Sequence, residues 1–164
     1  MREQSIEILF DLQPCITEPS EFRGIGCYSR ELFKSVASCS QEEDIRGFVF
    51  ERDRPGGSDI YQKLDDKISR SRIHRFPAMP YFDTPCDYNG GERDSLCGEL
   101  YNSCVQTINP NVIHLSHIFE GYSDSTIVPF LNRPPGQCLS ATLYDLIPLR
   151  FPEHYFQNKE TEKW

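Results

Sequence analysis

The amino-acid sequence predicts an α/β fold: a Rossmann-like parallel sheet with helices on both faces. The first observation is that short apolar runs alternate with amphipathic stretches along the chain, as strands do when crossover helices join them. The second is the rule that such crossovers are right-handed, which makes the arrangement Rossmann-like. The third is the length of 164 residues, which suits one domain with a single substantial core.

The first half of the chain supplies three predicted strands and two predicted helices. A mostly apolar run over residues 6–12 ends in Gln13-Pro14, which favours a strand over a helix. Residues 25–38 then carry apolar side chains at steps of three and four, the period of a helix. The later elements are a strand over 45–50, a short helix with Ser58 as its N-cap, and a strand over 72–76.

The second half continues the alternation after an irregular loop over 77–91. A helix is predicted over 92–108, because its apolar side chains recur every four residues until Asn109-Pro110 stops it. That apolar row consists of Leu96, Leu100, Cys104 and Ile108, and the apolar side chains of Cys97, Tyr101 and Val105 lie beside it. Strands are predicted over 112–117 and 137–144, and the tail from residue 151 is expected to begin another helix.

The composition excludes several classes of protein. With 25 acidic and 17 basic residues the net charge is −8, which disfavours a nucleic-acid binder, because phosphate contacts need clustered cations. No apolar run approaches the roughly 18 residues of a membrane span, and the N-terminal run is too short for a secretory signal. The seven cysteines show no C-x-x-C spacing, so we expect reduced, structural thiols in a cytoplasmic protein.

Two glycines mark a candidate anion site. Ligands of an open parallel sheet bind beyond the carboxyl ends of its strands, and Gly24 and Gly26 stand there, at the start of the first long helix. Glycine lets a ligand approach the backbone closely, and a helix N-terminus favours an anion such as phosphate. The alternative is that the glycines only form a tight turn. Neither a G-x-G-x-x-G nor a P-loop motif is present, which disfavours dinucleotide enzymes and P-loop NTPases.

Acidic and imidazole side chains follow two of the predicted strands. His114 and His117 are three residues apart, so a strand would place them on opposite faces, and we expect no metal site. Glu120, followed by Gly121, could accept hydrogen bonds from sugar hydroxyls or be a solvated loop acid. Asp145 stands in an apolar setting, so it either caps nearby N–H groups or faces the cleft.

Three stretches resemble bacterial GT4-type glycosyltransferases (glycosyl transferase group 1), especially those that build O-antigen and similar polysaccharides, mannosyltransferases among them. The first is ILFDLQPCITEPSEFRGIGCYSRELFKSVA, which is similar to their opening strand, "DLQ" and "RGIGRYS", with Cys27 in place of arginine. The others are NPNVIHLSHIFEGYSD, similar to "PDVVHvsSLFEG", and ATLYDLIPLRFPEHY, similar to "tvyDLIPl". Together they are fairly specific and span nearly the whole chain, except for residues 52–95.

The resemblance implies a GT-B enzyme, in which two Rossmann-like domains enclose the active site. Residues 1–164 would be the N-terminal, acceptor-side domain, and the C-terminal donor-binding domain would be absent from this chain. The implied reaction transfers a sugar, with retention of configuration, from a nucleotide-sugar donor to a glycan or lipid-linked acceptor. It needs no metal and no further cofactor, and the isolated domain is expected to be inactive.

The resemblance also assigns residues near the donor. Gly24 and Gly26 would meet the diphosphate of the nucleotide sugar, and Arg23 could assist, because the leaving diphosphate gathers negative charge. The alternative for Arg23 is an ion pair with Glu21 or Glu18. Tyr144 and Asp145 are the catalytic candidates, since they stand where many relatives carry a His-Asp pair. The tyrosine departs from the histidine of those relatives.

His117, Glu120 and Gly121 are the candidates for binding the acceptor or its sugar. The expected partners are the nucleotide sugar, the glycan or lipid-linked acceptor and the second domain, with peripheral association at the inner face of the membrane left open. The alternative function is a stand-alone α/β binding or interaction domain, related to glycosyltransferases but without catalysis. A nucleotide-dependent oxidoreductase is a third hypothesis, against which the missing third glycine counts.

Overall fold

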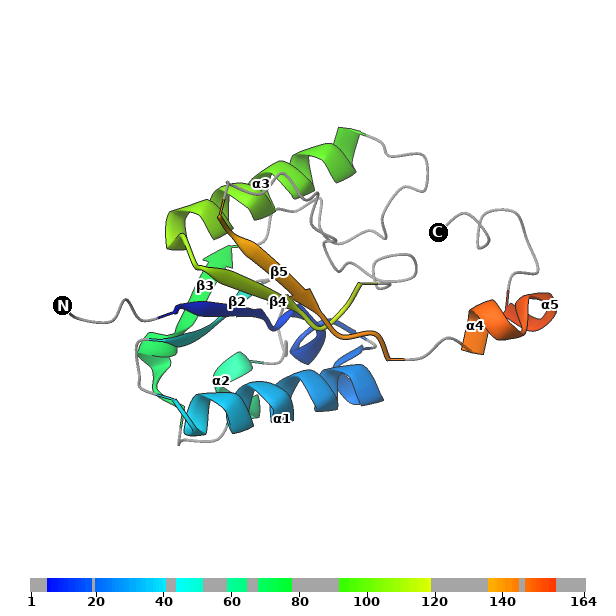
Figure 1. The fold of residues 1–164 in the computed structure, drawn as a ribbon, viewed down its shortest axis with the longest axis horizontal. Coiled ribbons are helices and arrows are strands. Elements are labelled where there is room, and N and C mark those ends of the chain that lie inside the picture. The colour runs from blue at the N-terminus through cyan, green and yellow to red at the C-terminus, as the bar shows by residue number, and fades with distance from the viewer. Residues whose placement is uncertain are drawn as a thin grey trace.

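The computed structural model contains a five-stranded parallel sheet with helices on both faces, which confirms the predicted fold class (Figure 1). The strand order is β3-β2-β1-β4-β5, so the chain builds outward from β1 on one side before it crosses to the other. The structure describes residues 6–18, 20–40, 44–51, 59–64, 68–77, 92–118, 136–144 and 147–155.

The elements lie close to their predicted places. The strands are β1 (Ile8–Asp11), β2 (Ile45–Glu51), β3 (Ile73–Pro77), β4 (Val112–Leu115) and β5 (Cys138–Ala141). The helices are α1 (Gly24–Ser38), α2 (Ile60–Lys63), α3 (Glu92–Ile108), α4 (Ile147–Arg150) and α5 (Pro152–Tyr155). Short 3-10 turns, η1 (Gln13–Cys15), η2 (Ser20–Phe22) and η3 (Arg70–Arg72), connect them.

Two details of the helices differ from the prediction. The N-cap of α2 is Asp59 and not Ser58, because the Asp59 carboxylate accepts a hydrogen bond from the backbone N–H of Tyr61 at 3.0 Å. On α3, Tyr101 and Val105 are buried as part of the predicted apolar face, but Leu96, which the prediction placed in the apolar row, is exposed. None of the helices in the described ranges is both long and apolar enough to cross a membrane.

The face of the sheet covered by α1 and α2 holds one of two apolar cores. Phe10 of β1 packs against Phe33 of α1, with the ring centroids 5.6 Å apart and the rings edge to face. Val49 of β2 and Ile60 of α2 complete the centre of this core, and both are fully buried. Burial of these side chains fixes α1 across β1 and β2, with its N-terminus at the carboxyl end of β1 (Figure 1).

The opposite face packs against α3. Leu9, Phe48 and Ile113 point from three neighbouring strands to this side and are buried together with Tyr101 of the helix. Successive residues of a strand face opposite sides of the sheet, so Asp11 lies on the same side as Leu9, at the end of β1. The carboxylate is therefore directed toward α3, where the tyrosine can reach it.

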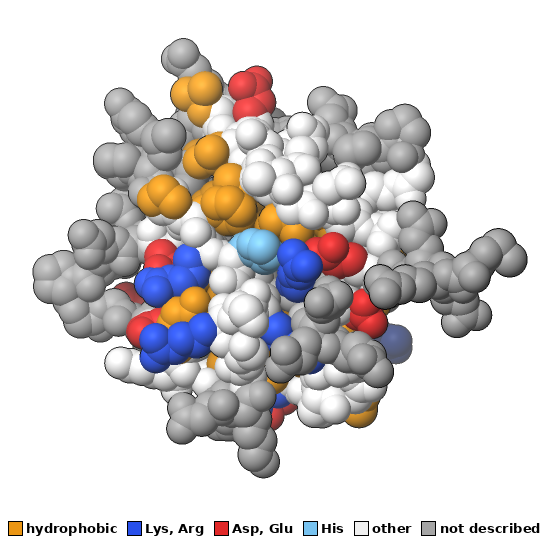
Figure 2. All heavy atoms as spheres, turned by 90° about the vertical axis from the view of Figure 1, so that its left-hand side faces the viewer, with side chains coloured by type: hydrophobic (Ala, Val, Ile, Leu, Met, Phe, Trp, Pro, Cys, Tyr) orange, Lys and Arg blue, Asp and Glu red, His pale blue; other side chains and the backbone are white. Residues whose placement is uncertain are grey.

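The amino ends of the strands form a surface of mixed charge. Figure 2 shows this end of the molecule, where acidic and basic side chains lie beside one another, mostly below a group of hydrophobic ones. One such pair joins the first two strands, with Arg46 Nε 3.2 Å from Glu7 Oε1. Among the described residues, charges of both signs alternate at this end, whereas the carboxyl ends of the strands carry a specific polar arrangement.

We predict that Phe33→Ala lowers the free energy of unfolding by about 3–5 kcal/mol, because it empties the fully buried space between α1 and β1. Leu96→Ala is the matched control: the side chain is 57% exposed, so the expected change is within about 0.5 kcal/mol. Urea unfolding followed by circular dichroism measures both. Equal effects of the two substitutions would contradict the assignment of this core.

Candidate functional site

The candidate site lies at the carboxyl ends of β1 and β4, where the strand order reverses. These two strands are neighbours in the sheet, but the chain leaves β1 toward α1 on one face, whereas α3 precedes β4 on the other. The divergence opens the edge of the sheet at this point, which is where open α/β sheets bind ligands. The described residues around it come from β1, η1, η2, α1, α3, the end of β4 and the segment after β5.

A buried carboxylate, that of Asp11, lies at the carboxyl end of β1. Asp11 is fully buried, and its Oδ1 accepts a hydrogen bond from the backbone N–H of Gln13 at 2.9 Å. Its Oδ2 accepts hydrogen bonds from Gln13 Nε2 and from the Tyr101 hydroxyl, each at 2.9 Å. His117 Nε2 lies 2.8 Å from the same oxygen. A charge removed from water needs such partners, and these offset much of its desolvation cost.

The hydroxyl of Tyr101, which donates to Asp11, has a defined protonation state. Complete burial, together with the charge of Asp11, raises the pKa of Tyr101 well above its ordinary value. The phenol therefore keeps its proton and acts as a donor to the carboxylate. Ser116, directly before His117, is also fully buried, and its Oγ has no hydrogen-bond partner among the described residues.

The two glycines at the start of α1 have different surroundings. A Cβ on Gly26 would lie 2.4 Å from the carbonyl oxygen of Ser20 and 2.6 Å from that of Pro14, so close backbone packing requires glycine there. A Cβ on Gly24 would meet nothing within 4 Å. Packing thus accounts for Gly26, whereas Gly24 leaves the helix start open to a ligand.

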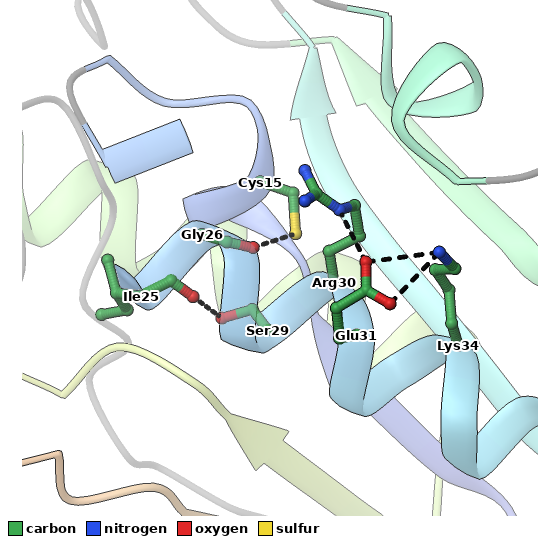
Figure 3. A network of polar contacts seen from close by, with 7 residues as sticks. All are labelled: Cys15, Ile25, Gly26, Ser29, Arg30, Glu31 and Lys34. Atoms are coloured by element: carbon green, nitrogen blue, oxygen red, sulfur yellow. Dashed lines mark hydrogen bonds and ion pairs between the residues drawn. The ribbon is translucent and has the colours of Figure 1, made fainter. Parts of the chain in front are cut away.

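The thiol of Cys15 completes the packing of η1 on α1. The Cys15 sulfur lies 3.7 Å from the carbonyl oxygen of Gly26 and points toward it (Figure 3). Burial raises the pKa of Cys15 to about 12, so the sulfur stays a thiol and is no nucleophile at neutral pH. Its role here is structural, as predicted for the cysteines.

The face of α1 next to the site carries the partly buried Arg30 and Lys34, which pair with the exposed Glu31. Glu31 Oε1 lies 3.2 Å from Arg30 Nε, and its other oxygen is 3.2 Å from Lys34 Nζ (Figure 3). Hydrogen bonds from both cations lower the pKa of the Glu31 carboxyl. Such surface pairs contribute little stability, but they leave these cations less available to a ligand than Arg23.

Tyr144 reaches the first turns of α1 from the segment after β5. Its hydroxyl lies 3.4 Å from Ser29 Oγ and 3.5 Å from the carbonyl oxygen of Ile25. Its ring meets that of Tyr28 edge to face, with the centroids 5.2 Å apart. The structure thus brings this catalytic candidate against the helix that begins at Gly24, although more than a hundred residues separate them in the sequence.

The remaining candidates near the donor lie in different surroundings. Arg23 is the N-cap residue of α1, is exposed, and makes no ion pair with another described residue. The nearby Glu21 is buried and pairs instead with Lys63 of α2. Asp145 lies outside the described residues, as do Glu120 and Gly121.

The two histidines lie on opposite sides of the sheet, as their spacing predicts. His114 shares the α1 side with Phe10, and its ring nitrogens lie 2.9 Å from Ser140 Oγ and 3.2 Å from Thr142 Oγ1. Burial lowers the pKa of His114. His117 is fully buried against Asp11 on the α3 side, so its ring contacts other protein groups and is not exposed to solvent. The described ranges contain no group of three side chains that could hold a metal ion.

Asp11, Gln13 and Tyr101 are site residues that the sequence motifs did not reveal. A signal was nevertheless present, because an acid at the end of the apolar run ILFD must find partners when the strand is buried. A tyrosine in a buried helix face likewise needs an acceptor for its hydroxyl. The sequence therefore indicates that Asp11 and Tyr101 each need a polar partner, but it does not show that they are partners of one another.

Comparison with protein-family models, with curated proteins and with solved structures gave no match to this chain. The resemblance to glycosyltransferases therefore stays a prediction, and the chemistry of the site comes from its own residues. These are an open helix start with an exposed arginine, an exposed pair of tyrosines, and a buried Asp-His-Tyr cluster beneath them.

We predict that Gly26→Ala lowers the free energy of unfolding by about 1–3 kcal/mol, because its Cβ would overlap two backbone carbonyl groups. Gly24→Ala is the matched control and should be neutral or stabilising by up to about 1 kcal/mol, since the new methyl group enters open space in a helix. Chemical denaturation of both variants gives the comparison. A Gly26→Ala protein as stable as the parent would show that packing does not require this glycine.

Proposed function

We propose that this chain is the acceptor-side domain of a retaining glycosyltransferase, which moves a sugar from a nucleotide-sugar donor to a glycan or lipid-linked acceptor. One observation carries the proposal. The three stretches that resemble such enzymes, far apart in the sequence, meet at the switch point of a Rossmann-like sheet. Tyr144 of the third contacts Ser29 of the first, and His117 of the second contacts Asp11 of the first.

The start of α1 suits the diphosphate of the donor. A leaving nucleoside diphosphate gains negative charge, which the N–H groups and dipole of a helix N-terminus stabilise. Gly24 offers no side chain to obstruct this approach, and Arg23 adds an exposed cation beside it. Because Gly26 is enclosed by η1 and η2, its proposed contribution is to let these turns close against the helix.

The remaining predicted residues complete the proposal. Tyr144 places a hydroxyl beside the first turns of α1, and Asp145 follows it in the chain. We assign these two to the reacting sugar, and Glu120 and Gly121 to the acceptor. The donor-binding domain would supply most contacts to the nucleoside, so residues 1–164 alone should bind a donor weakly.

The proposal predicts where a donor binds. Titration of the ¹⁵N-labelled chain with a panel of nucleotide sugars should shift the amide signals of residues 24–29, with an affinity much weaker than micromolar. Gly24→Val is expected to abolish these shifts, because it places a branched side chain on the open helix start, where an added Cβ has no neighbour within 4 Å. Shifts confined to other parts of the chain, or unaffected by Gly24→Val, would exclude this diphosphate site.

Catalysis is tested with the chain joined to a donor-binding domain. The two-domain protein should transfer a sugar from at least one member of the panel to a lipid-linked glycan, with retained configuration. Neither transfer nor donor hydrolysis with any member of the panel would overturn the enzyme proposal. Tight, micromolar binding by residues 1–164 alone would contradict the proposed division of labour between the domains.

A second candidate function is a non-catalytic binding domain, and one observation favours it. The chain after β5 exposes several large apolar side chains, and such groups often mark protein interfaces. They are Leu143, Ile147, Leu149 and Phe151. A folded protein that ignores every nucleotide sugar in both experiments would support this alternative over the enzyme.

A further inference from the structure

We propose that Lys63 is a positioning residue of the anion site at the start of α1: by pairing with Glu21 it keeps this carboxylate away from Arg23 and from the bound anion. Lys63 is the last residue of α2 and lies in the part of the chain, residues 52–95, outside the glycosyltransferase-like stretches. Its role rests on the proposed function, since it needs an anion at Gly24, whereas the ion pair itself is a feature of the structure.

Glu21 brings a negative charge close to the helix start. Its Cα would lie 2.9 Å from a Cβ on Gly26, so the residue packs against the first turn of α1. Its backbone is fixed there, because its N–H donates to the carbonyl oxygen of Thr17 at 2.9 Å. The carboxylate stays within one side-chain length of this turn, inside the roughly 10 Å over which charges act at 0.1 M salt. An unpaired Glu21 would therefore oppose the binding of phosphate.

Lys63 balances this charge inside the protein. Its Nζ donates a hydrogen bond to Glu21 Oε2, and the two side chains are 15% and 3% exposed. The ammonium also lies over the Phe22 ring, 5.0 Å from its centroid, so it contacts two residues of η2. Its place is set by α2, whose first residue, Ile60, is fully buried in the core shared with α1. Loss of one partner of such an enclosed pair leaves an unbalanced charge.

Arg23 is the cation that competes for Glu21. It stands two residues further along the chain, is exposed, and makes no ion pair with another described residue. Without Lys63, the carboxylate would have Arg23 as its nearest cation along the chain and would turn toward it. The arginine would then be neutralised by the protein before an anion arrives. Lys63 thus keeps the positive charge beside the helix start available to a ligand.

The test uses inorganic pyrophosphate as the anion. It is titrated into the ¹⁵N-labelled chain at pH 8, where glutamates are ionised, and the amide shifts at residues 24–29 give the affinity. Lys63→Met should weaken binding by about three- to tenfold, the effect of one uncompensated charge close to a bound anion. The loss should shrink in about 1 M salt, where charges are screened beyond roughly 3 Å. Unchanged affinity in folded Lys63→Met would overturn the proposal.

Two further variants separate charge from packing. Lys63→Arg keeps the ion pair and should bind pyrophosphate as the unmodified chain does. The double variant Glu21→Gln/Lys63→Met removes both charges and should regain the affinity that Lys63→Met loses, because neutral side chains often replace a buried ion pair at little cost. A double variant as weak as Lys63→Met would refute the role, since the loss would then come from packing.

Arg46→Met is the control for net charge. It also removes one cation, but from the pair with Glu7 at the amino ends of the strands, so the affinity should not change. A loss equal to that of Lys63→Met would count against a local effect and refute the role. If Lys63→Met does not fold, Glu21→Gln decides: it removes only the acid and should bind pyrophosphate at least as tightly as the unmodified chain, and weaker binding would contradict the proposal.

Failure of this role and failure of the proposed function give different results. Equal affinities in all variants, together with transfer by the two-domain protein, would remove only the role of Lys63. The expected series of affinities without transfer or nucleotide-sugar binding would refute the proposed function and leave an anion site controlled by Lys63. An unmodified chain without pyrophosphate shifts at residues 24–29 would refute both.

Discussion

A single buried carboxylate organises the carboxyl edge of this sheet. Removing a charge from water costs several kcal/mol even in a relaxed protein interior, so Asp11 is tolerable only while its donors are in place. One donor, the Tyr101 hydroxyl, comes from α3, ninety residues away in the sequence, and the ring of His117, beyond the end of β4, lies 2.8 Å from the same oxygen. The requirement to satisfy one group thereby fixes an adjacent turn, a helix and a strand end relative to one another.

The same constraint extends to the start of α1. Gln13, held by Asp11, opens η1, and the next two residues of this turn contact Gly26 through a carbonyl oxygen and a thiol. Gly26 has no space for a side chain, so the first turn of α1 is seated directly on η1. The turn η1 thus links the buried residues around Asp11 to the exposed start of α1. The packing of η1 against Gly26 sets the position of the N–H groups at the helix N-terminus.

Periodicity predicted the fold well because it reports burial, which local sequence encodes. The seventeen residues of α3 begin and end where the pattern and Asn109-Pro110 place them. The four-residue α4 was missed, because a single turn has no period to detect. The candidate site was harder to predict than the fold. The sequence indicates that Asp11 and Tyr101 each need a hydrogen-bond partner, but only the packing of α3 on the sheet brings them together. The contact of Tyr144 with α1 likewise depends on strand order, which the sequence leaves open.

The burial of Gly26 and His117 changes which residues of the glycosyltransferase-like motifs are candidates for ligand contact. Because packing alone demands Gly26, its presence in a RGIG stretch says little about phosphate, and the argument for an anion site passes to Gly24, whose surroundings are open. His117 is fully buried in contact with Asp11, so its ring is not exposed to solvent. Under the proposed function, direct contact with a sugar would fall to groups at the surface, and Tyr144 is the described candidate that combines exposure with a place beside the helix start.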